Sequence, residues 1–308
     1  MTLEASSSVF LIGNRDLGVV ARLFREAGAE VRELNAEGPT VAGAVREIQR
    51  AMIDEKAARL VVVGGDGMVH AGVNALAPLA AGGFDVSLGV VPLGTGNDFA
   101  RALRLPLDDP SAAVRRALAP ARKIDLLHTG DRWIATVATC GFAARVNERA
   151  NRLRFPRGAS KYTLATLLLV PRFAGDELRV LPTNSDTDVD AVARCRPDES
   201  ITSVHTIVAI ANTGWFGGGM HVAPYARPED GFLDIVQVGR LRRLELLRYL
   251  PTIFSGAHVK HPATTLSVAK SVRIEGATSM ELWGDGEYVC PLPVIVSLMP
   301  SALAVAGV

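Results

Sequence analysis

The sequence has little of several features whose abundance would assign it to a special class. Its 308 residues include three cysteines, Cys140, Cys195 and Cys290, which are widely scattered and form no CxxC pair. This argues against a disulfide framework and a cysteine zinc site, and it favours a reducing compartment. Lysine and arginine number 33 against 32 aspartate and glutamate, which leaves a formal net charge of +1. The net charge therefore produces no strong positive electrostatic field, and nothing in it indicates nucleic acid as a partner.

Long apolar runs and targeting segments are also missing. No window reaches the roughly 18 uninterrupted apolar residues that a membrane-spanning helix needs. The first ten residues, MTLEASSSVF, carry an early glutamate and no basic stretch, so we expect no signal peptide. Hydrophobic residues make up 48% of the chain, which is enough for two core-forming domains or one large one. We expect a cytoplasmic protein.

The first part of the chain alternates between strand and helix patterns. Apolar runs at 9–13, 59–65 and 87–94 predict strands, and segments with helical periodicity follow them, at 17–28, 41–57, 68–80 and 98–105. Such alternation is typical of a parallel sheet with helices on its faces. We therefore predict an α/β domain over residues 1–123.

The pattern changes after about residue 124. Short β-rich segments separated by Gly, Asp or Pro turns begin with a hairpin at Gly130-Asp131, and helical insertions interrupt them at about 143–173 and 242–256. This texture predicts an antiparallel β-sandwich over residues 124–308. The polar stretch 183–200 predicts a surface loop.

Two glycine turns follow successive strands of the predicted parallel sheet. The first is Gly64-Gly65-Asp66-Gly67, and the second is Gly94-Thr95-Gly96-Asn97-Asp98. Either alone is compatible with an ordinary strand-to-helix turn in which a polar side chain caps the helix. Together they open at the carboxyl edge of one sheet, where such sheets bind ligands. Glycines there suit phosphates, and Mg²⁺ held by Asp66 and Asp98 would bridge the carboxylates to a polyphosphate.

Two further polar stretches lie in the β-rich part. One has three glycines at 217–219, followed by Glu229, Asp230 and Asp234 around a turn. The other is WGDGEYV at 283–289, which includes Asp285 and Glu287. Asp285-Gly286 alone is typical of an ordinary hairpin turn. For Asp234 alone we favour a structural role in a hairpin turn.

The ordered set of these motifs resembles the diacylglycerol kinase catalytic family, in particular its soluble bacterial branch, which is similar to the sphingosine and ceramide kinases. The matching pieces cover almost the whole chain: GGDG at 64–67, PLGTGNDFAR at 92–101, RKID at 122–125, GGGMHVAP at 217–224, EDGFLD at 229–234 and DGE at 285–287. The resemblance implies an N-terminal α/β domain related to NAD kinases and phosphofructokinases, a C-terminal antiparallel β-sandwich with the lipid site, and a cleft between them. It also implies transfer of the γ-phosphoryl group of ATP, with Mg²⁺, to diacylglycerol or a similar lipid alcohol.

The resemblance also assigns roles by position. Asp230 matches the proposed general base, Glu287 lies beside the reacting centre, and Asp66 and Asp98 complete the catalytic and metal-binding set, to which Glu229 is a further candidate for metal. The positions facing the nucleotide are Gly64, Gly65, Asp66, Gly67, Gly94, Thr95, Gly96, Asn97 and Asn14.

Three positions depart from the family pattern. Met68 replaces a usual threonine, Ala71 replaces a usual glutamate, and the loop at Asn14 lacks the usual glycine-rich stretch. These departures leave open a lipid-binding protein with weakened or no kinase activity. A second alternative is an NAD kinase-like enzyme, because GGDG is shared with that group.

A basic segment precedes the apolar YTLATLLLV stretch. We predict that Arg154, Arg157 and Lys161 contact an anionic membrane surface, which would make the protein a peripheral membrane protein. A solvated helix face is the alternative for these residues. A homodimer is compatible with the sequence.

Overall fold

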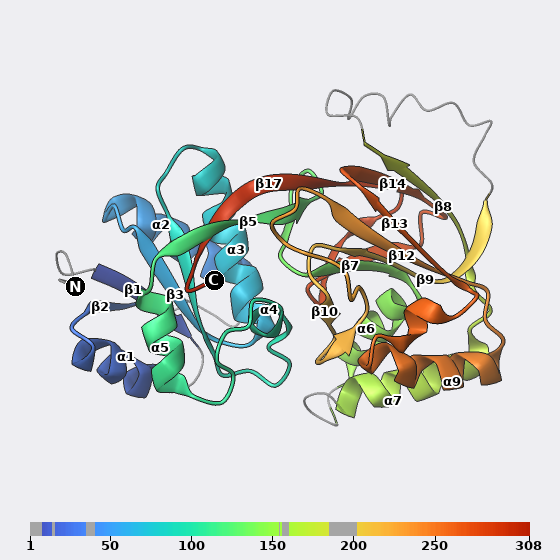
Figure 1. The fold of residues 1–308 in the computed structure, drawn as a ribbon, viewed down its shortest axis with the longest axis horizontal. Helices are drawn as coiled ribbons and strands as arrows, with labels where there is room; N and C mark the ends of the chain where they lie inside the picture. The colour runs from blue at the N-terminus through green and yellow to red at the C-terminus, as the bar shows by residue number, and fades with distance from the viewer. Residues whose placement is uncertain (1–7, 14–15, 35–40, 154, 156–159, 185–201) are drawn as a thin grey trace. The chain divides into compact units, whose positions relative to one another are not determined.

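The computed structural model describes residues 8–13, 16–34, 41–153, 155, 160–184 and 202–308 (Figure 1). Asn14, Arg154, Arg157 and nearly all of the predicted loop at 183–200 lie outside the described residues. The chain forms two compact units, Met1–Asp125 with Pro300–Val308, and Leu126–Met299. The sequence predicts that 300–308 belongs to the second domain, but the end of the last strand pairs with a strand of unit 1.

Unit 1 contains the parallel sheet that the sequence predicted. Its strands are β1 (Ser8–Gly13), β2 (Glu30–Leu34), β3 (Arg59–Gly64) and β4 (Ser87–Pro92), in the order β2–β1–β3–β4, and each neighbouring pair is parallel. The end of β17 (Val294–Ala306) adds a parallel neighbour to β4, with Ala304 opposite Ser87. Every residue of β4 is buried, as expected for a central strand covered on both faces.

Helices cover both faces of this sheet. They are α1 (Leu17–Glu26), α2 (Val41–Asp54), α3 (Asp66–Ala81), the short α4 (Asp98–Ala102) and α5 (Pro110–Leu118). Apolar side chains of α1 and α5 form one core with alternate residues of β1 and β3. On the other face α3 lies so close that a Cβ on Gly72 would be 2.8 Å from Val62 Cγ1 and 3.1 Å from Leu88 Cδ1. The strands β3 and β4 are thereby fixed between two helical layers.

Unit 2 is the predicted sandwich. Its strands are β5 (Ala121–His128), which enters from unit 1, β6 (Trp133–Ile134), β7 (Val137–Gly141), β8 (Asp176–Thr183), β9 (Ser203–Ala211), β12 (Leu233–Gly239), β13 (Thr264–Ala269), β14 (Ser271–Glu275), β15 (Glu281–Gly284), β16 (Glu287–Pro291) and the first part of β17. One layer runs β16–β15–β7–β9–β12–β13, with antiparallel pairs throughout. The other runs β8–β14–β17–β5–β6, and β8 also pairs with β9.

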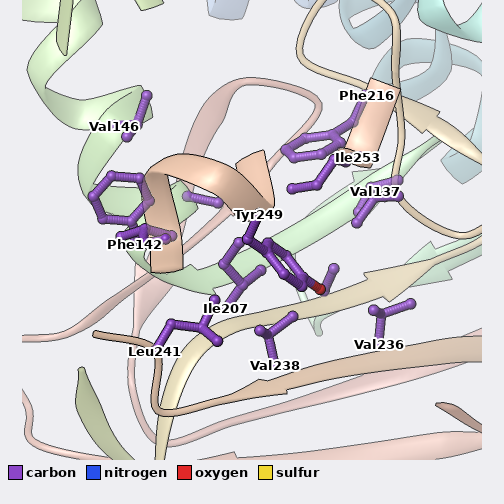
Figure 2. Close-up of a cluster of buried hydrophobic side chains, with 14 of the residues drawn as sticks. Val137, Phe142, Val146, Ile207, Phe216, Val236, Val238, Leu241, Tyr249 and Ile253 are labelled. Atoms are coloured by element: carbon purple, nitrogen blue, oxygen red, sulfur yellow. The ribbon is translucent and has the colours of Figure 1, made fainter. Parts of the chain in front are cut away.

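The first layer separates two cores because its side chains alternate between its faces. On β9, Val208 and Ile210 pack between the layers, whereas Ile207, Ala209 and Ala211 face the helices. Figure 2 shows this helix-side core, where Tyr249 of one helix points toward Val236 and Val238 of β12 and Ile253 of the same helix lies near Phe216. The helical elements are α6 (Phe142–Arg152), α7 (Ser160–Leu169), η1 (Val170–Arg172), α9 (Arg243–Phe254) and η2 (Ala257–Lys260). In the described part of the chain, no helix is long and apolar enough to cross a membrane.

Candidate active site

The two glycine turns of unit 1 lie at one edge of its sheet. The parallel register pairs Gly64 with Pro92, so β3 and β4 end at the same level, and Leu93 N donates to Gly64 O at 3.0 Å. Helix α3 begins at Asp66, immediately after β3. The edge therefore combines glycine backbone with the positive end of a long helix, which suits anionic groups.

The two turns touch each other through glycine backbone. A Cβ on Gly94 would lie 2.3 Å from Gly65 Cα and 3.0 Å from Gly65 N, and a Cβ on Gly65 would lie 3.0 Å from Gly94 Cα. Because a side chain at Gly94 would displace backbone, this position accepts glycine alone without rearrangement. The sequence indicated flexible loops here. The structure shows that glycine is needed because the two turns are in backbone contact.

Asn97 closes the second turn on itself. Its Oδ1 accepts a hydrogen bond from Gly94 N at 3.0 Å, and its Nδ2 donates to Gly94 O at 2.9 Å. The backbone of Asn97 is left-handed (φ 53°), and its side chain makes no capping bond to α4. Asn97 therefore does not cap α4 with its side chain, because both ends of its amide bond to Gly94 within the turn. Arg101 Nη2 lies across the same turn, 3.4 Å from Gly96 O.

The carboxylate of Asp66 reaches from the first turn to the second. Its Oδ1 accepts a hydrogen bond from Phe99 N at 3.2 Å, next to Asp98, which is buried at 4% exposure. Asp66 is partly exposed, and Gly67 and Thr95 are exposed. The described residues contain no group of three or more His, Cys, Asp or Glu side chains that could hold a metal. Two carboxylates suit Mg²⁺ when phosphate oxygens and water complete the coordination shell, so these residues fit a magnesium nucleotide.

In unit 2, the polar motifs gather at one end of the first sheet layer. Asp234 on β12 pairs with Ala211 at the end of β9, and Ala211 pairs with Val137 at the start of β7. Asp285, after β15, donates its N–H to Val137 O at 3.2 Å, and Glu287 begins β16. The register therefore brings segments 230–234, 212–214 and 285–287 to one edge, although they are far apart in sequence.

Asp285 is a structural member of this edge. Its two carboxylate oxygens accept hydrogen bonds from Ala135 N at 2.9 Å, Thr136 N at 2.8 Å and Thr136 Oγ1 at 2.6 Å. These bonds hold the segment between β6 and β7. No local sequence pattern singles out Thr136, because its partner is 149 residues away.

Asn212 and Thr213 directly follow β9, which ends at Ala211, and both are fully buried. Asn212 Nδ2 donates to Ala135 O at 3.0 Å, while Thr213 Oγ1 has no hydrogen-bond partner within the described ranges. A buried hydroxyl without a partner is uncommon in proteins, so Thr213 is a further polar group to consider at this edge. From the sequence these two residues were assigned no role; the signal that could have found them is a polar pair directly after a buried apolar strand.

Asp230 and Asp234 form an acidic pair on the β12 side of the edge. Asp230 is exposed, and its Oδ1 accepts a hydrogen bond from Phe232 N at 3.0 Å across Gly231, which has a φ of 79°. Burial, and secondly the charge of Asp230, raise the pKa of Asp234 to about 6. Asp234 thus belongs electrostatically to the site, beyond the plain turn role that we favoured.

Glu287 and Glu229 have fewer internal contacts. The carboxylate of Glu287 is partly exposed and has no hydrogen-bond partner among the residues described. Asn151 of α6 fixes the adjacent turn by donating Nδ2 to Gly286 O at 3.2 Å. Glu229 is exposed. The structure thus groups Asp230, Asp234 and Glu287 on one edge of unit 2, and Asp66 and Asp98 on one edge of unit 1.

The glycine triplet and its aromatic neighbours adjoin this edge. Gly217, Gly218 and Gly219 all have positive φ (64°, 85° and 109°), so this hairpin between β10 (Trp215–Phe216) and β11 (Met220–His221) requires glycine. The indole of Trp215 stacks on His221 with centroids 4.0 Å apart. Phe216 belongs to the helix-side core (Figure 2).

Lys161 is the one predicted membrane-contact residue that the structure describes. Its Nζ donates to Asn151 Oδ1 at 3.1 Å and lies 5.0 Å from the centroid of the Tyr162 ring. These contacts give the ammonium group a local structural role near the turn at Gly286.

Comparison with known proteins matches both units. The pattern of the diacylglycerol kinase catalytic domain matches residues 11–129, and that of the YegS C-terminal NAD kinase beta sandwich-like domain matches residues 136–307. A diacylglycerol kinase of Mycobacterium tuberculosis (strain ATCC 25618 / H37Rv) is 37% identical over 294 residues, which cover 94% of this chain and 88% of the relative.

Two other relatives are more distant. A Pseudomonas aeruginosa protein named "Probable lipid kinase YegS-like" is 29% identical and aligns over 95% of this chain and 90% of its own length. A crystal structure of a diacylglycerol kinase from Bacillus anthracis str. Sterne superposes with a TM-score of 0.73 at 21% identity, covering 97% of this chain and 96% of that one. The structural likeness supports the two-domain fold.

Proposed function

Because this chain belongs to the diacylglycerol kinase and YegS-like lipid kinase family, we propose that it transfers the γ-phosphoryl group of ATP, with Mg²⁺, to the hydroxyl of diacylglycerol or a similar lipid alcohol. Family membership supports a lipid kinase, a phosphotransferase with an alcohol acceptor. The nucleotide, the metal and the particular lipid belong to the proposal.

The observation that carries the proposal is the carboxylate edge of unit 2. Two segments distant in sequence, 230–234 and 285–287, supply Asp230, Asp234 and Glu287 to one end of a sheet layer, and Asp285 fixes the neighbouring backbone with three hydrogen bonds. A carboxylate whose oxygens are not all engaged in hydrogen bonds within the protein can accept a proton from an alcohol or orient its hydroxyl group.

The nucleotide side of the proposal rests on the turns of unit 1. Gly64, Gly65 and Gly94 keep side chains away from this edge, and α3 directs its positive end toward it. Asp66 and Asp98 are the two carboxylates that would hold Mg²⁺. The bound metal nucleotide would supply the transferable phosphoryl group and neutralise its charge.

Asp230 is the proton acceptor in this proposal. Phe232 N holds its Oδ1 at 3.0 Å, which orients the carboxylate while the side chain stays exposed. Oδ2 would take the proton of the lipid hydroxyl as its oxygen bonds to the γ-phosphorus of ATP and the bond from that phosphorus to the β,γ-bridging oxygen breaks, with ADP as the leaving group. Glu287 would orient the same hydroxyl group. Proton removal by a positioned carboxylate contributes typically about 10²–10⁴-fold to a rate.

The test is transfer of labelled phosphate from ATP to diacylglycerol in mixed micelles. We expect transfer by the wild type and a loss of about 10²-fold or more with Asp230→Asn. Asp85→Asn is the matched control, because Asp85 is also exposed and lies in the α3–β4 loop of unit 1. Urea unfolding of both variants shows whether either change alters stability.

Two outcomes would favour the alternatives. Phosphorylation of NAD without any lipid product would support the NAD kinase-like enzyme. Binding of lipid in calorimetry with no binding of magnesium ATP would support a lipid-binding protein without activity. Equal activity of Asp230→Asn and Asp85→Asn would remove the proton acceptor from the proposal even if the wild type is a lipid kinase.

The proposal also includes peripheral contact with an anionic membrane, because a long-chain alcohol lies in a bilayer. Of the predicted contact residues, Lys161 is the one described, and its ammonium group contacts Asn151 and the Tyr162 ring.

A further inference from the structure

Helix α9 packs one side against the core of unit 2. Leu246, Tyr249 and Ile253 are buried, and Figure 2 shows Tyr249 and Ile253 directed into the helix-side core. Tyr249 Oη and Thr264 Oγ1 are 2.8 Å apart, which ties the helix to β13. This side accounts for the position of α9 in the fold.

The opposite side of α9 is also apolar, although it is exposed. Leu244 is 71% exposed, Leu247 41% and Phe254 56%. Their spacing of three and seven residues places them on one side of a helix. Solvent-facing helix sides are normally polar, and a contiguous apolar stripe at a surface indicates an interaction site. We call these three residues, with the flanking Arg243 and Arg248, the α9 face.

Arginines surround this stripe. Arg243 and Arg248 are exposed on α9, and Arg240 and Arg242 are exposed just before it. The four line a cavity of about 790 Å³ together with Phe173 and Tyr249, a volume within the range of small-ligand sites. Within the described ranges, none of the four guanidinium groups has an ion-pair partner.

The one carboxylate among the residues that line the cavity, Glu245, interacts with neighbouring residues of the protein. Glu245 Oε2 accepts a hydrogen bond from Arg242 N at 3.2 Å, and Oε1 lies 3.7 Å from His261 Nε2. The cavity and the α9 face therefore present an excess of positive charge beside exposed leucine and phenylalanine.

We propose that the α9 face docks on an anionic lipid bilayer. Exposed leucine and phenylalanine would enter the acyl boundary, while the arginines would meet lipid phosphates, which is the arrangement of interfacial helices. The cavity would accept one phosphate headgroup. This surface is separate in sequence from the basic segment at 149–161.

Charge favours a bilayer over a second copy of the chain. A two-fold dimer places the same patch on both partners, so arginines of one copy would face arginines of the other, and like-charge contacts are unfavourable. Two leucines of α7, Leu167 (58%) and Leu168 (39%), are also exposed, and α9 contacts η1, which continues α7.

The inference rests on the proposed function only in that a lipid substrate lies in a membrane, and its test omits catalysis. The full chain is co-sedimented with phosphatidylcholine vesicles with and without phosphatidylglycerol, in the absence of nucleotide and alcohol substrate. We expect binding that depends on phosphatidylglycerol and weakens with salt. The double variant R243Q/R248Q should lower the partition coefficient about 30-fold.

Matched controls separate the α9 face from general surface effects. R22Q/R115Q removes two exposed arginines from α1 and α5 of unit 1, and it should leave partitioning unchanged. L247S/F254S should reduce binding about tenfold or more, whereas V19S/I53S, which alters exposed apolar residues of α1 and α2, should not. Thermal unfolding of each variant excludes loss of the fold.

Three results would overturn the inference: equal binding of the wild type to neutral and anionic vesicles, equal loss in the control pairs, or a dimer in sedimentation that L247S/F254S dissociates without any vesicle binding. Vesicle binding without phosphate transfer would leave the inference intact and contradict the proposed function. Transfer to a soluble short-chain alcohol without vesicle binding would do the reverse.

Discussion

The two candidate edges of this protein are built by different means. In unit 1 the edge is made of backbone, because the backbones of Gly65 and Gly94 are in contact. The side-chain amide of Asn97 forms two hydrogen bonds with the backbone of Gly94. In unit 2 the edge is made of side chains, and its carboxylates differ in how many internal bonds they make. Asp285 accepts three hydrogen bonds, whereas Glu287 has none within the described residues. A backbone edge tolerates little change in shape, and a side-chain edge tolerates changes in shape more readily than changes in charge.

The largest effect is expected from Gly94→Ala. The new Cβ would meet Gly65 Cα at 2.3 Å, so the two turns must separate, at a cost of about 1–3 kcal/mol in the free energy of unfolding. We expect loss of nucleotide binding and of phosphate transfer. Urea unfolding and calorimetry measure the two effects. For stability, Gly67→Ala is the control, because nothing lies within 4 Å of a Cβ there; equal destabilisation by both would show that contact between the turns is not the cause.

The second prediction separates the two acidic residues around Gly286. Glu287→Gln should lower kcat about 100-fold or more with little change in the free energy of unfolding, because its carboxylate makes no internal bond. Asp285→Asn should destabilise unit 2 by about 1–3 kcal/mol, since an amide cannot accept all three hydrogen bonds. Kinetics and urea unfolding of the two variants test this. Destabilisation by the Glu287 change and none by the Asp285 change would reverse the assignment.

A smaller effect is expected from pH through Asp234. Its pKa is about 6 in the folded protein against 3.8 for the ordinary group, so the unfolded chain loses its proton first. Stability from this group is present below pH 3.8 and is lost as the pH rises to about 6. After allowance for solvent screening the loss is about 1 kcal/mol. Urea midpoints between pH 4 and 7 should fall less in Asp234→Asn than in the wild type, and parallel curves would contradict the shift.

The smallest effect is expected at Met68, whose side chain lies over Gly64, with Met68 Cγ 2.9 Å from the place of a Cβ on Gly64. Met68→Thr should tighten nucleotide binding about fivefold, because a hydroxyl at the start of α3 can donate to a phosphate. Met68→Ala serves as the comparison that removes the packing without adding a donor. If calorimetry gives the same dissociation constant for both variants, the hydroxyl has no role.

Much of unit 1 could be predicted because its strands are apolar and end in glycine turns. The prediction missed β2, because only Leu34 of that strand is buried, and an exposed edge strand has no apolar run. It also missed α5, which starts at Pro110 after the cap Asp109 and has three buried residues. The predicted helices at 68–80 and 98–105 shift to Asp66–Ala81 and Asp98–Ala102, and Arg104, with a φ of 53°, cannot continue the second helix.

In unit 2 the sequence predicted the type of structure better than its connections. The helical insertions are confirmed as α6, α7 and α9. The β-rich stretch 264–275 is continuous in the sequence, but the structure divides it into two strands, β13 and β14. Strand β8 was missed because its burial alternates only weakly. The roles of Thr136 and Asp285 depend on hydrogen bonds across about 150 residues, and no local pattern encodes such a pairing. Motif order located the acidic residues, but only the strand register brought them to one edge.

Strand β17 has a consequence for any attempt to produce the units separately. Its first part pairs with β14, its end pairs with β4, and Ser301 N donates to the buried Asp125 at 2.7 Å. A fragment cut after residue 123 would lose both the last strand of its own sheet and the carboxylate that anchors it. An independently folding unit 1 would have to be made by splicing the final nine residues back onto the truncated chain, and a cut at the sequence boundary would give an incomplete domain.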